Sequence, residues 1–151
     1  MIQNTVEKFI HWLLTTDPRT AYVFGHRVYP VLAPQGATKT GAAGMRTFAV
    51  YRRLSTQRDT VDLNGGINAS QVEVQIECYA DSYVAAREAG SAVLSVVASY
   101  TGDAYGSKIL TAMQSAESDE VAIPVDGKST PIYALSQSFQ IRLTESPNNR
   151  P

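Results

Sequence analysis

Residues able to carry out acid–base or nucleophilic chemistry are few in this sequence and lie far apart. His11 falls within a helical pattern but off its apolar stripe, and His26 lies in a predicted loop beside Arg27. The two histidines have neither the HxH nor the HxxxH spacing of metal ligands. Cys78 falls on the apolar side of an alternating segment, whereas a reactive cysteine needs partial exposure and a positive environment. We therefore expect both histidines at the surface and Cys78 in the core.

Two further patterns resemble ligand-binding motifs but lack the spacing that the chemistry requires. The glycines near Lys39 do not form GxxxxGK[ST], because Lys39 and Thr40 precede a glycine instead of following one. The acidic run from Glu117 to Asp126 lacks the ordered ligand positions of a calcium loop, so we expect a solvated loop there. The sequence therefore predicts no catalytic residue, no cofactor site and no metal site, and indicates a protein that is not an enzyme.

Arginines gathered around one predicted strand form the remaining candidate site. Glutamates lie on the predicted partner strand, and cross-strand ion pairs would contribute about 0.2–1 kcal/mol each. A charged protein interface is the second interpretation, because arginine is favoured at protein contacts. A turn signal, Asn64-Gly65-Gly66, marks the tip of the same hairpin. The candidate interface residues are Arg46, Arg52, Arg53, Arg58, Asn64, Gly65, Glu73 and Glu77.

Bulk composition narrows the class of protein. The 151 residues suit one domain, and 44% hydrophobic with 18% charged residues is ordinary for a globular chain. Thirteen Lys and Arg against 14 Asp and Glu leave a net charge of -1, which does not suit a duplex nucleic acid partner. A single cysteine indicates a reducing compartment, and no run approaches the eighteen or so apolar residues of a membrane span. We expect a soluble intracellular protein.

Periodicity predicts the elements that must position these side chains. From Gln71 to Ala80, apolar and polar residues alternate strictly, which indicates a strand with one buried face. Amphipathic helices are expected before Pro18 and from about Ser82 to Tyr100. Further strands are predicted at 47–54, 109–116 and 132–143, and a short extended piece at 27–30. In the strand at 47–54, Phe48, Val50 and Leu54 are expected on one side, with a bulge or a strand end near Arg52 because it shares their parity.

The element order predicts an α+β domain. Its expected form is a roughly four-stranded antiparallel sheet with two helices packed on one face, because most connections between strands are short. Residues 1–145 would form this single domain, and residues 146–151 a flexible C-terminal tail.

The ordered landmarks of the chain resemble the small tail-completion or tail-terminator proteins of long-tailed bacteriophages. The resemblance covers roughly residues 3 to 143 and departs from many relatives at Ala33–Gly44 and Met45-Arg46, where these have a proline before the second strand. Its landmarks are the N-terminal helix ending near Asp17-Pro18, then Arg27–Pro30, Ala33–Gly36, Phe48–Ser55, Val74–Ala80, Ala86–Ala89 and Ser136–Ile141.

The resemblance implies a structural role in the virion. Such proteins form a ring, commonly of six subunits, that caps the head-proximal end of the tail tube and joins the tail to the head or neck. The implied partners are other copies of the chain, the major tail tube protein and a head-completion or neck protein. No cofactor, membrane or sequence-specific nucleic acid is implied, although the genome would pass through the lumen. Assembly would take place in the host bacterial cytoplasm. The alternative from another class is a small non-enzymatic protein- or ligand-binding module.

Overall fold

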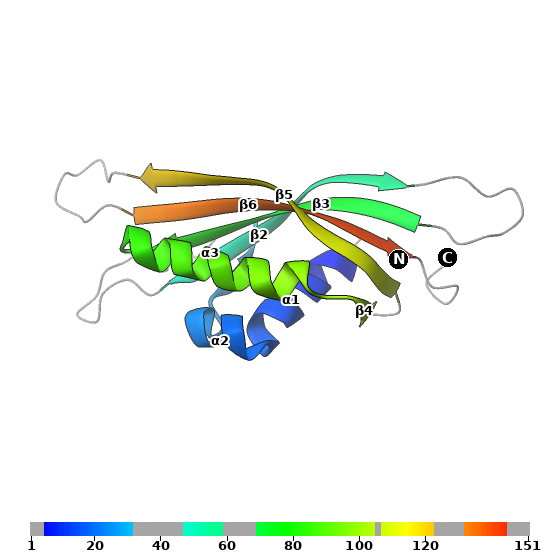
Figure 1. Cartoon of the computed structure of the whole chain (residues 1–151), viewed down its shortest axis with the longest axis horizontal. Helices are drawn as coiled ribbons and strands as arrows, with labels where there is room; N and C mark the ends of the chain where they lie inside the picture. Colours follow the sequence, from blue (N-terminus) through cyan, green and yellow to red (C-terminus); the bar gives the residue numbers. More distant parts are fainter. Residues whose placement is uncertain (1–4, 32–46, 59–68, 105–106, 123–131, 145–151) are drawn as a thin grey trace, which may run out of the picture.

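The computed structural model describes residues 5–31, 47–58, 69–104, 107–122 and 132–144 and shows a twisted sheet with helices on one face (Figure 1). The strands lie in the order β1-β2-β3-β6-β5-β4. In Figure 1, all three described helices lie below the sheet and leave its upper side without a helix. The described elements are α1 (Thr5–Thr16), α2 (Pro18–Phe24), β1 (Val28–Pro30), β2 (Phe48–Arg58), β3 (Ala69–Ala80), α3 (Tyr83–Ala98), β4 (Gly102–Ala104), β5 (Ser107–Ala122) and β6 (Ile132–Thr144).

Strand β3 lies at the centre of the sheet, as its strict alternation predicts. It pairs antiparallel with β2 on one side and with β6 on the other. Its apolar residues, from Val72 through Ile76 to Ala80, are buried against the helices, and its polar residues face the opposite side half-buried. The predicted burial of Cys78 is confirmed, with no exposed surface. The period of two therefore fixes which face of the sheet receives the helices.

The expected count of roughly four strands is too low, although the α+β class is correct. Strands β2, β3, β6 and β5 form the antiparallel centre, and the three-residue strands β1 and β4 flank it. Strand β1 pairs with β2 in parallel, so the sheet is not wholly antiparallel. The short extended piece expected at 27–30 is found as β1, but its pairing with β2 depends on contacts remote in sequence. The three residues of β4 show too little of a two-residue period for a strand prediction.

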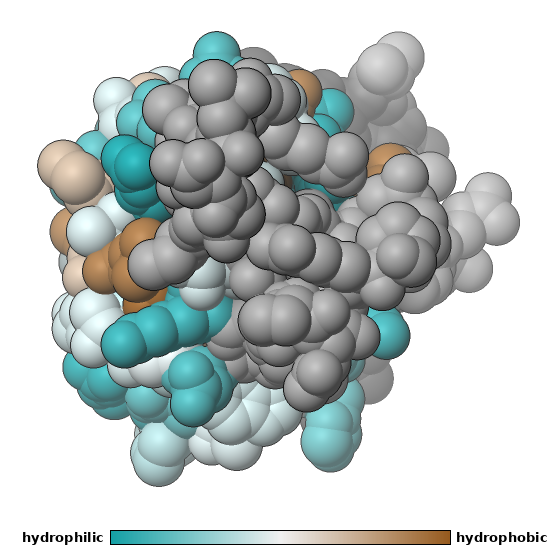
Figure 2. All heavy atoms as spheres, turned by 90° about the vertical axis from the view of Figure 1, so that its right-hand side faces the viewer, coloured by the Kyte–Doolittle hydropathy of each residue, from teal (hydrophilic) through white to brown (hydrophobic). Residues whose placement is uncertain are grey.

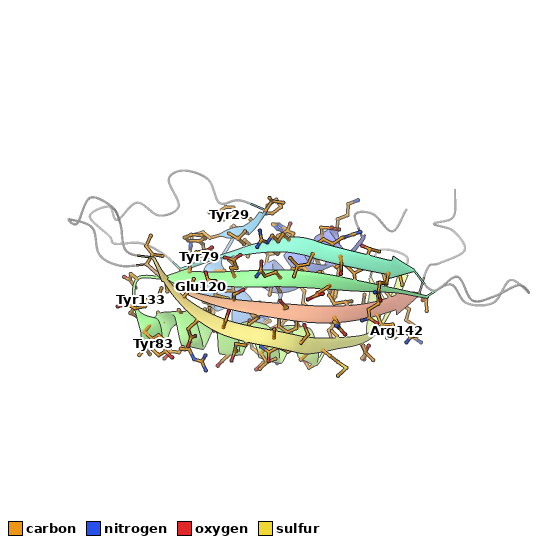
Figure 3. All side chains as sticks on the ribbon, turned by 90° about the horizontal axis from the view of Figure 1, so that it is seen from above. Tyr29, Tyr79, Tyr83, Glu120, Tyr133 and Arg142 are labelled. Carbon is orange, nitrogen blue, oxygen red and sulfur yellow. The ribbon has the colours of Figure 1, made fainter. Side chains whose placement is uncertain are left out.

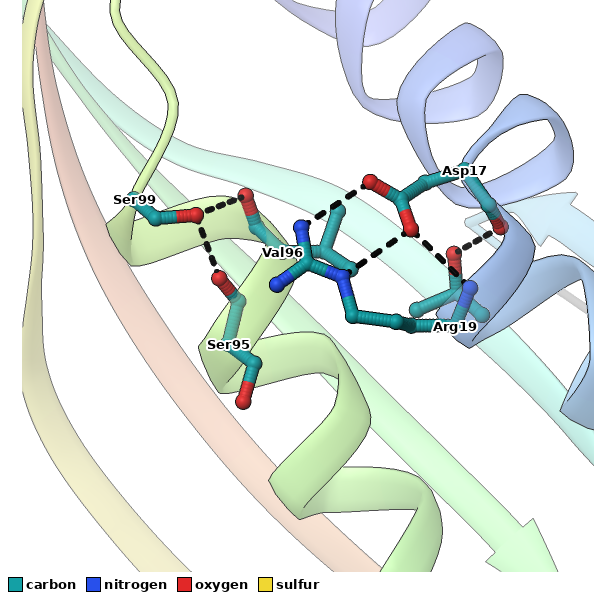
Figure 4. Close-up of polar contacts among 6 residues, drawn as sticks. Asp17, Arg19, Ser95, Val96 and Ser99 are labelled. Atoms are coloured by element: carbon teal, nitrogen blue, oxygen red, sulfur yellow. Dashed lines mark hydrogen bonds and ion pairs between the residues drawn. The ribbon is translucent and has the colours of Figure 1, made fainter.

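A third helix was also missed. Pro18 ends α1, as expected, but it also occupies the first turn of α2, where its missing N–H costs nothing. Asp17 caps this second helix, accepting a 2.9 Å hydrogen bond from the Arg19 backbone N–H and a 3.0 Å ion pair from its guanidinium (Figure 4). These contacts lower the pKa of Asp17 below its ordinary value, chiefly through the Arg19 side chain. Asp17-Pro18 is thus a junction between two helices.

Acidic β5 is longer than its sequence suggests. The expected solvated loop from Glu117 is wrong up to Ala122, because these residues continue the strand and pair with β6. Polar residues are tolerated in a strand at the border of the sheet, where one side of the backbone meets solvent, so charge alone misled the prediction. The remaining part of the predicted loop lies outside the described residues.

Helix α3 packs its small residues against the sheet, as its sequence predicts. Ser82 is the N-cap, and its hydroxyl accepts a 3.1 Å hydrogen bond from the Ala85 N–H. Gly90 lies so close to β6 that a Cβ atom there would come within 1.8 Å of Leu135 Cδ2. Beside this contact, the buried Gln137 side chain donates a 2.9 Å hydrogen bond from Nε2 to the Gly90 carbonyl. Gln137, which interrupts the apolar face of β6, therefore anchors α3 to the sheet.

Helices α1 and α2 complete the core beside α3. Residues of the α1 stripe, including Val6, Phe9 and Leu14, are fully buried, and the rings of Phe9 and Tyr100 lie 4.8 Å apart. Within the described segments, no helix is long and apolar enough to cross a membrane. The predicted loop Ala33–Gly44, the turn at Asn64-Gly65-Gly66 and the tail at 146–151 lie outside the described residues.

Replacing Gly90 with alanine tests the close approach of α3 to β6. The added methyl group must displace Leu135 in a packed core, at a cost of about 1–3 kcal/mol. The gain in helix propensity is only about 1 kcal/mol. The difference between the two is about 0–2 kcal/mol, so we expect Gly90→Ala to lower the free energy of unfolding by about 1 kcal/mol, measured by urea denaturation. Exposed Ser91→Ala is the control and should be neutral or slightly stabilising; equal midpoints for the two variants would contradict the contact.

Candidate interaction surface

The face of the sheet that carries no helix is lined mainly by amide, hydroxyl and charged side chains from β2, β3, β6 and β5; it is called the outer face below. Figure 3 looks onto this face, with Tyr29, Tyr79 and Glu120 toward one end and Arg142 toward the other. Its polar side chains include Arg52, Gln71, Glu73, Gln75, Glu77, Thr111, Ser118, Glu120, Ser136, Ser138, Gln140 and Arg142.

Hydrogen bonds between strands hold the outer face in order. Arg52 Nε donates to Gln75 Oε1 at 2.7 Å, and Gln75 Nε2 donates to Ser136 Oγ at 2.8 Å. Farther along, Gln71 Nε2 donates to Gln140 Oε1 at 2.9 Å. The first two bonds form a chain across β2, β3 and β6, which limits the rotamers available to its members. The face is therefore a pre-ordered polar platform.

The predicted cross-strand ion pairing is found for Arg52. Its guanidinium lies 3.8 Å from Glu77 Oε1, with half of the Arg52 side chain exposed. A pair this long and this exposed contributes little to stability. The remaining exposed part of Arg52 is available to another molecule, so both interpretations of this arginine fit the geometry.

Arg53 lies on the opposite face from Arg52. Its guanidinium makes a 2.8 Å ion pair with Glu7 Oε2 of α1, beneath the sheet. The predicted bulge is present in β2, where the pairing register shifts between Arg53 and Ser55. The arginines that the sequence grouped together are thus split, with Arg52 on the outer face and Arg53 joining β2 to α1.

Only part of the predicted interface falls where its side chains are described. Glu73 and Glu77 both lie half-buried on the outer face, in rows with Gln140 and Ser136 of β6. The predicted residues Arg46, Asn64 and Gly65 lie outside the described segments, as does the side chain of Arg58. The described part of the predicted interface therefore centres on Arg52, Glu73 and Glu77.

An aromatic cluster occupies the end of the outer face that is opposite Arg142, and sequence reasoning missed it. The rings of Phe48 and Tyr79 stack at 4.9 Å, and Tyr29 lies 6.0 Å from Phe48. Phe48 and Val50 share a side, as expected, but that side faces away from the helices, whereas Leu54 falls at the bulge and is exposed. Tyr29 comes from β1, where it pairs with Val50 of β2, and no local pattern reveals this contact.

A hydroxyl–carboxylate contact ties this cluster to the charged part of the face. The Tyr79 hydroxyl donates a hydrogen bond to Glu77 Oε2, and the same glutamate lies near Arg52. Burial, and next the hydrogen bond to Glu77, raise the pKa of Tyr79 above its ordinary value. The phenol therefore stays protonated and acts as a donor throughout the physiological pH range.

Acidic residues of β5 on the helix side are partly neutralised by α3. Arg87 Nη1 lies 3.3 Å from Asp119 Oδ1 and 3.6 Å from Glu117 Oε2, and the Tyr83 hydroxyl lies 3.1 Å from Asp119. All of these side chains are at least one-third exposed. Glu120, in contrast, lies on the outer face of β5, where it opposes Ala134. Charge on β5 is thus distributed over both faces of the strand.

The described residues contain no cluster of side chains that resembles a catalytic or metal-binding site. Both histidines are exposed, as expected, and no group of three or more metal-ligating side chains occurs within the described segments. Figure 2 views the molecule from the side at which β2 ends, and the described hydrophobic residues form only small separate patches there.

The fold and this surface define a class: an α+β domain whose sheet is covered by helices on one side and polar on the other. No protein-family model matches the sequence, and a search of curated proteins finds no match. Among solved structures, the chain is similar to one from the "Virion of native gene transfer agent (GTA) particle", with a TM-score of 0.60 and 15% identity. The match covers 89% of this chain and 91% of that chain. At this identity the likeness shows a shared fold.

Burial makes a prediction for the single thiol. It raises the pKa of Cys78 from 9.0 to about 12, with a smaller contribution from Glu77. At pH 8 the native thiol is therefore neutral as well as inaccessible. We expect no reaction with a thiol-specific aromatic disulfide reagent in the native protein and one equivalent of reaction in urea. Rapid stoichiometric labelling of the native protein would contradict the described packing of β3.

Proposed function

We propose that this protein is a structural component of a phage-like virion, forming a ring that caps the head-proximal end of the tail tube and joins the tail to the head or neck. The observation that carries the proposal is the fold shared, over nearly the full length of both chains, with a chain from a gene transfer agent virion. The ordered sequence landmarks that resemble tail-terminator proteins support the specific position in the tail.

The polar outer face supports an assembly role. Such a ring requires a contact between two different surfaces of the same subunit, repeated until the rotation closes. A persistent contact of this kind buries on the order of 1,000 Å² or more. The described sheet offers a long, ordered and helix-free surface, with half-exposed Arg52 and Glu120 on it. A face of this size and polarity is suited to contacts that form after folding.

A non-enzymatic binding module, monomeric or dimeric, is the alternative from the sequence, and the number of copies in the assembly distinguishes it from the ring. We expect the purified chain, or the chain mixed with its tail tube protein, to form a closed oligomer of uniform mass. The measurement is size-exclusion chromatography with multi-angle light scattering, followed by negative-stain imaging for a central hole. The partners expected in the virion are the tail tube protein and a head-completion or neck protein.

The control separates assembly from aggregation. Raising the salt concentration weakens contacts between exposed charges, because the Debye length falls from about 10 Å at 0.1 M to 3 Å at 1 M. To the extent that exposed charges contribute to the contact, a specific ring should therefore shift toward folded monomers at high salt, whereas an aggregate of unfolded chains should not. A chain that stays monomeric at high concentration and in the presence of the tail tube protein would contradict the ring.

A further inference from the structure

Among the described residues, the sheet has an open stretch on each of its two sides, and each is the C-terminal part of a long strand. Strand β4 pairs only with Ser107–Ile109, which leaves β5 without a described partner on that side from Leu110 to Ala122. Strand β1 pairs with Ala49–Tyr51, which leaves β2 open, among the described residues, from Arg52 to Arg58. Open edges carry unsatisfied backbone N–H and C=O groups and act as templates for another strand.

The two edges carry opposite charge. The sequence places Glu117, Asp119 and Glu120 on the open stretch of β5, and Arg52, Arg53 and Arg58 on the open stretch of β2. Arg87 already contacts Glu117 and Asp119, and Glu7 contacts Arg53, so the described contrast depends chiefly on Glu120 and half-exposed Arg52. Pairing β5 with β5 across a two-fold axis would set acids against acids, and pairing β2 with β2 would set arginines against arginines. Like charges directly opposite each other are destabilising in a sheet. Charge therefore favours a β5 edge against the β2 edge of another copy, which is a heterologous contact.

Strand direction agrees with this contact. Three successive antiparallel pairings join β2 to β3, β3 to β6 and β6 to β5, so β2 and β5 of one subunit run in opposite directions. In a ring whose strands run roughly along its axis, rotation preserves strand direction. The β5 strand of one subunit then meets the β2 strand of the next in the antiparallel sense, and the pattern of the sheet continues across the seam.

The flanking strands and ring closure together indicate the register. Within one subunit, Arg52, Gln75, Ser138 and Ala116 form one cross-strand row. Closing a sheet requires a stagger between strands. In an eight-stranded barrel of shear 8, each strand is staggered by about one residue relative to its neighbour. At the same stagger, the four long strands of one subunit would contribute a shift of about four residues. If β2 of the next subunit shifted along β5 toward its N-terminal end, it would meet the residues of β5 that already pair with β4. Of the two directions, only a shift toward Glu120 leaves a long stretch of β5 available for pairing with β2.

We propose that β5 of one subunit pairs antiparallel with β2 of the next, at a shift of four positions from Ala116 that sets Glu120 opposite Arg52 and Asp119 opposite Arg53. An even shift keeps outer-face residues on the outer face, because side chains alternate with a period of two. Glu120 and Arg52 then meet on the outer face, and Asp119 and Arg53 on the helix side. This inference rests on the proposed ring and names the surface that closes it.

Engineered disulfides test the register directly. Directly opposed residues of an antiparallel pair have Cα atoms about 4.5–5.5 Å apart, within the range that a disulfide spans. We expect the variant with Arg52→Cys and Glu120→Cys to give, on mild oxidation, disulfide-linked dimers and higher multimers in non-reducing electrophoresis. Two strands, β3 and β6, lie between these two positions within one subunit, so the link must join two chains. Buried Cys78 stays out of the reaction.

Matched variants decide between registers and interfaces. The variant with Arg52→Cys and Ala116→Cys tests pairing without the four-residue shift. The single variant Glu120→Cys tests a two-fold contact between two β5 strands. Neither variant should give efficient disulfide links between chains. Efficient linking in either one instead of the 52/120 pair would overturn the proposed register. Closed oligomers by mass that lack a 52/120 link would overturn the seam while leaving the ring intact. A chain that forms no oligomer, alone or with its tail tube protein, would instead overturn the proposed function and this inference with it.

Discussion

The pairing of β3 with β6 is the constraint on which the rest of this structure depends. Each of these strands pairs with a neighbour on both sides, and α3 packs against their buried residues. Because side chains alternate in a strand, the same pairing that buries Val72, Ile76 and Phe139 sends Gln71, Gln75 and Gln140 to the other side. One set of backbone hydrogen bonds therefore creates both the core and the polar outer face. The composition of the outer face therefore follows directly from the strand pairing that forms the core.

Tight contact between α3 and the sheet sets the shape of the domain. Gly90 lets the helix backbone approach Leu135, and the Gln137 amide binds the Gly90 carbonyl at the same point. A buried amide inside an apolar stripe is costly unless it is hydrogen-bonded, so Gln137 specifies where along β6 the helix must lie. The sequence shows Gln137 only as an interruption of the pattern. Its role emerges when the partner element is in place.

Strong periodicity made the centre of the fold predictable, and weak or nonlocal signals hid its margins. The β3 alternation, the stripe of α3, the β2 bulge and the burial of Cys78 could all be inferred from the residues alone. Strands β1 and β4 are too short to show a period, and Pro18 indicates the end of one helix as readily as the start of another. The acidic end of β5 was predicted to be a loop because charged residues usually lie in solvent. A strand near the edge of a sheet can pair with its neighbour on one side and still expose charged side chains to solvent.

The geometry of the candidate surface could not be predicted from the sequence. The sequence grouped Arg52 with Arg53 and predicted that both would pair with glutamates of β3. In the structure, Arg52 lies near Glu77 of β3, whereas Arg53 forms an ion pair with Glu7 of α1. It also reveals the aromatic cluster around Phe48 and Tyr79, which depends on three separate segments meeting. The opposite charge of the two open edges follows only from the strand order, since β2 and β5 are remote in the chain but form the two margins of the antiparallel centre. Charge that the sequence assigned to one hairpin is instead divided between two sides of the domain.

Electron cryomicroscopy of the assembled protein, at a resolution that separates strands, tests the central claim most directly. The account predicts a closed ring in which β5 of each subunit lies antiparallel beside β2 of its neighbour, so that the sheets join around the ring. A two-fold dimer, or a ring whose subunits meet only through their helices, would contradict it.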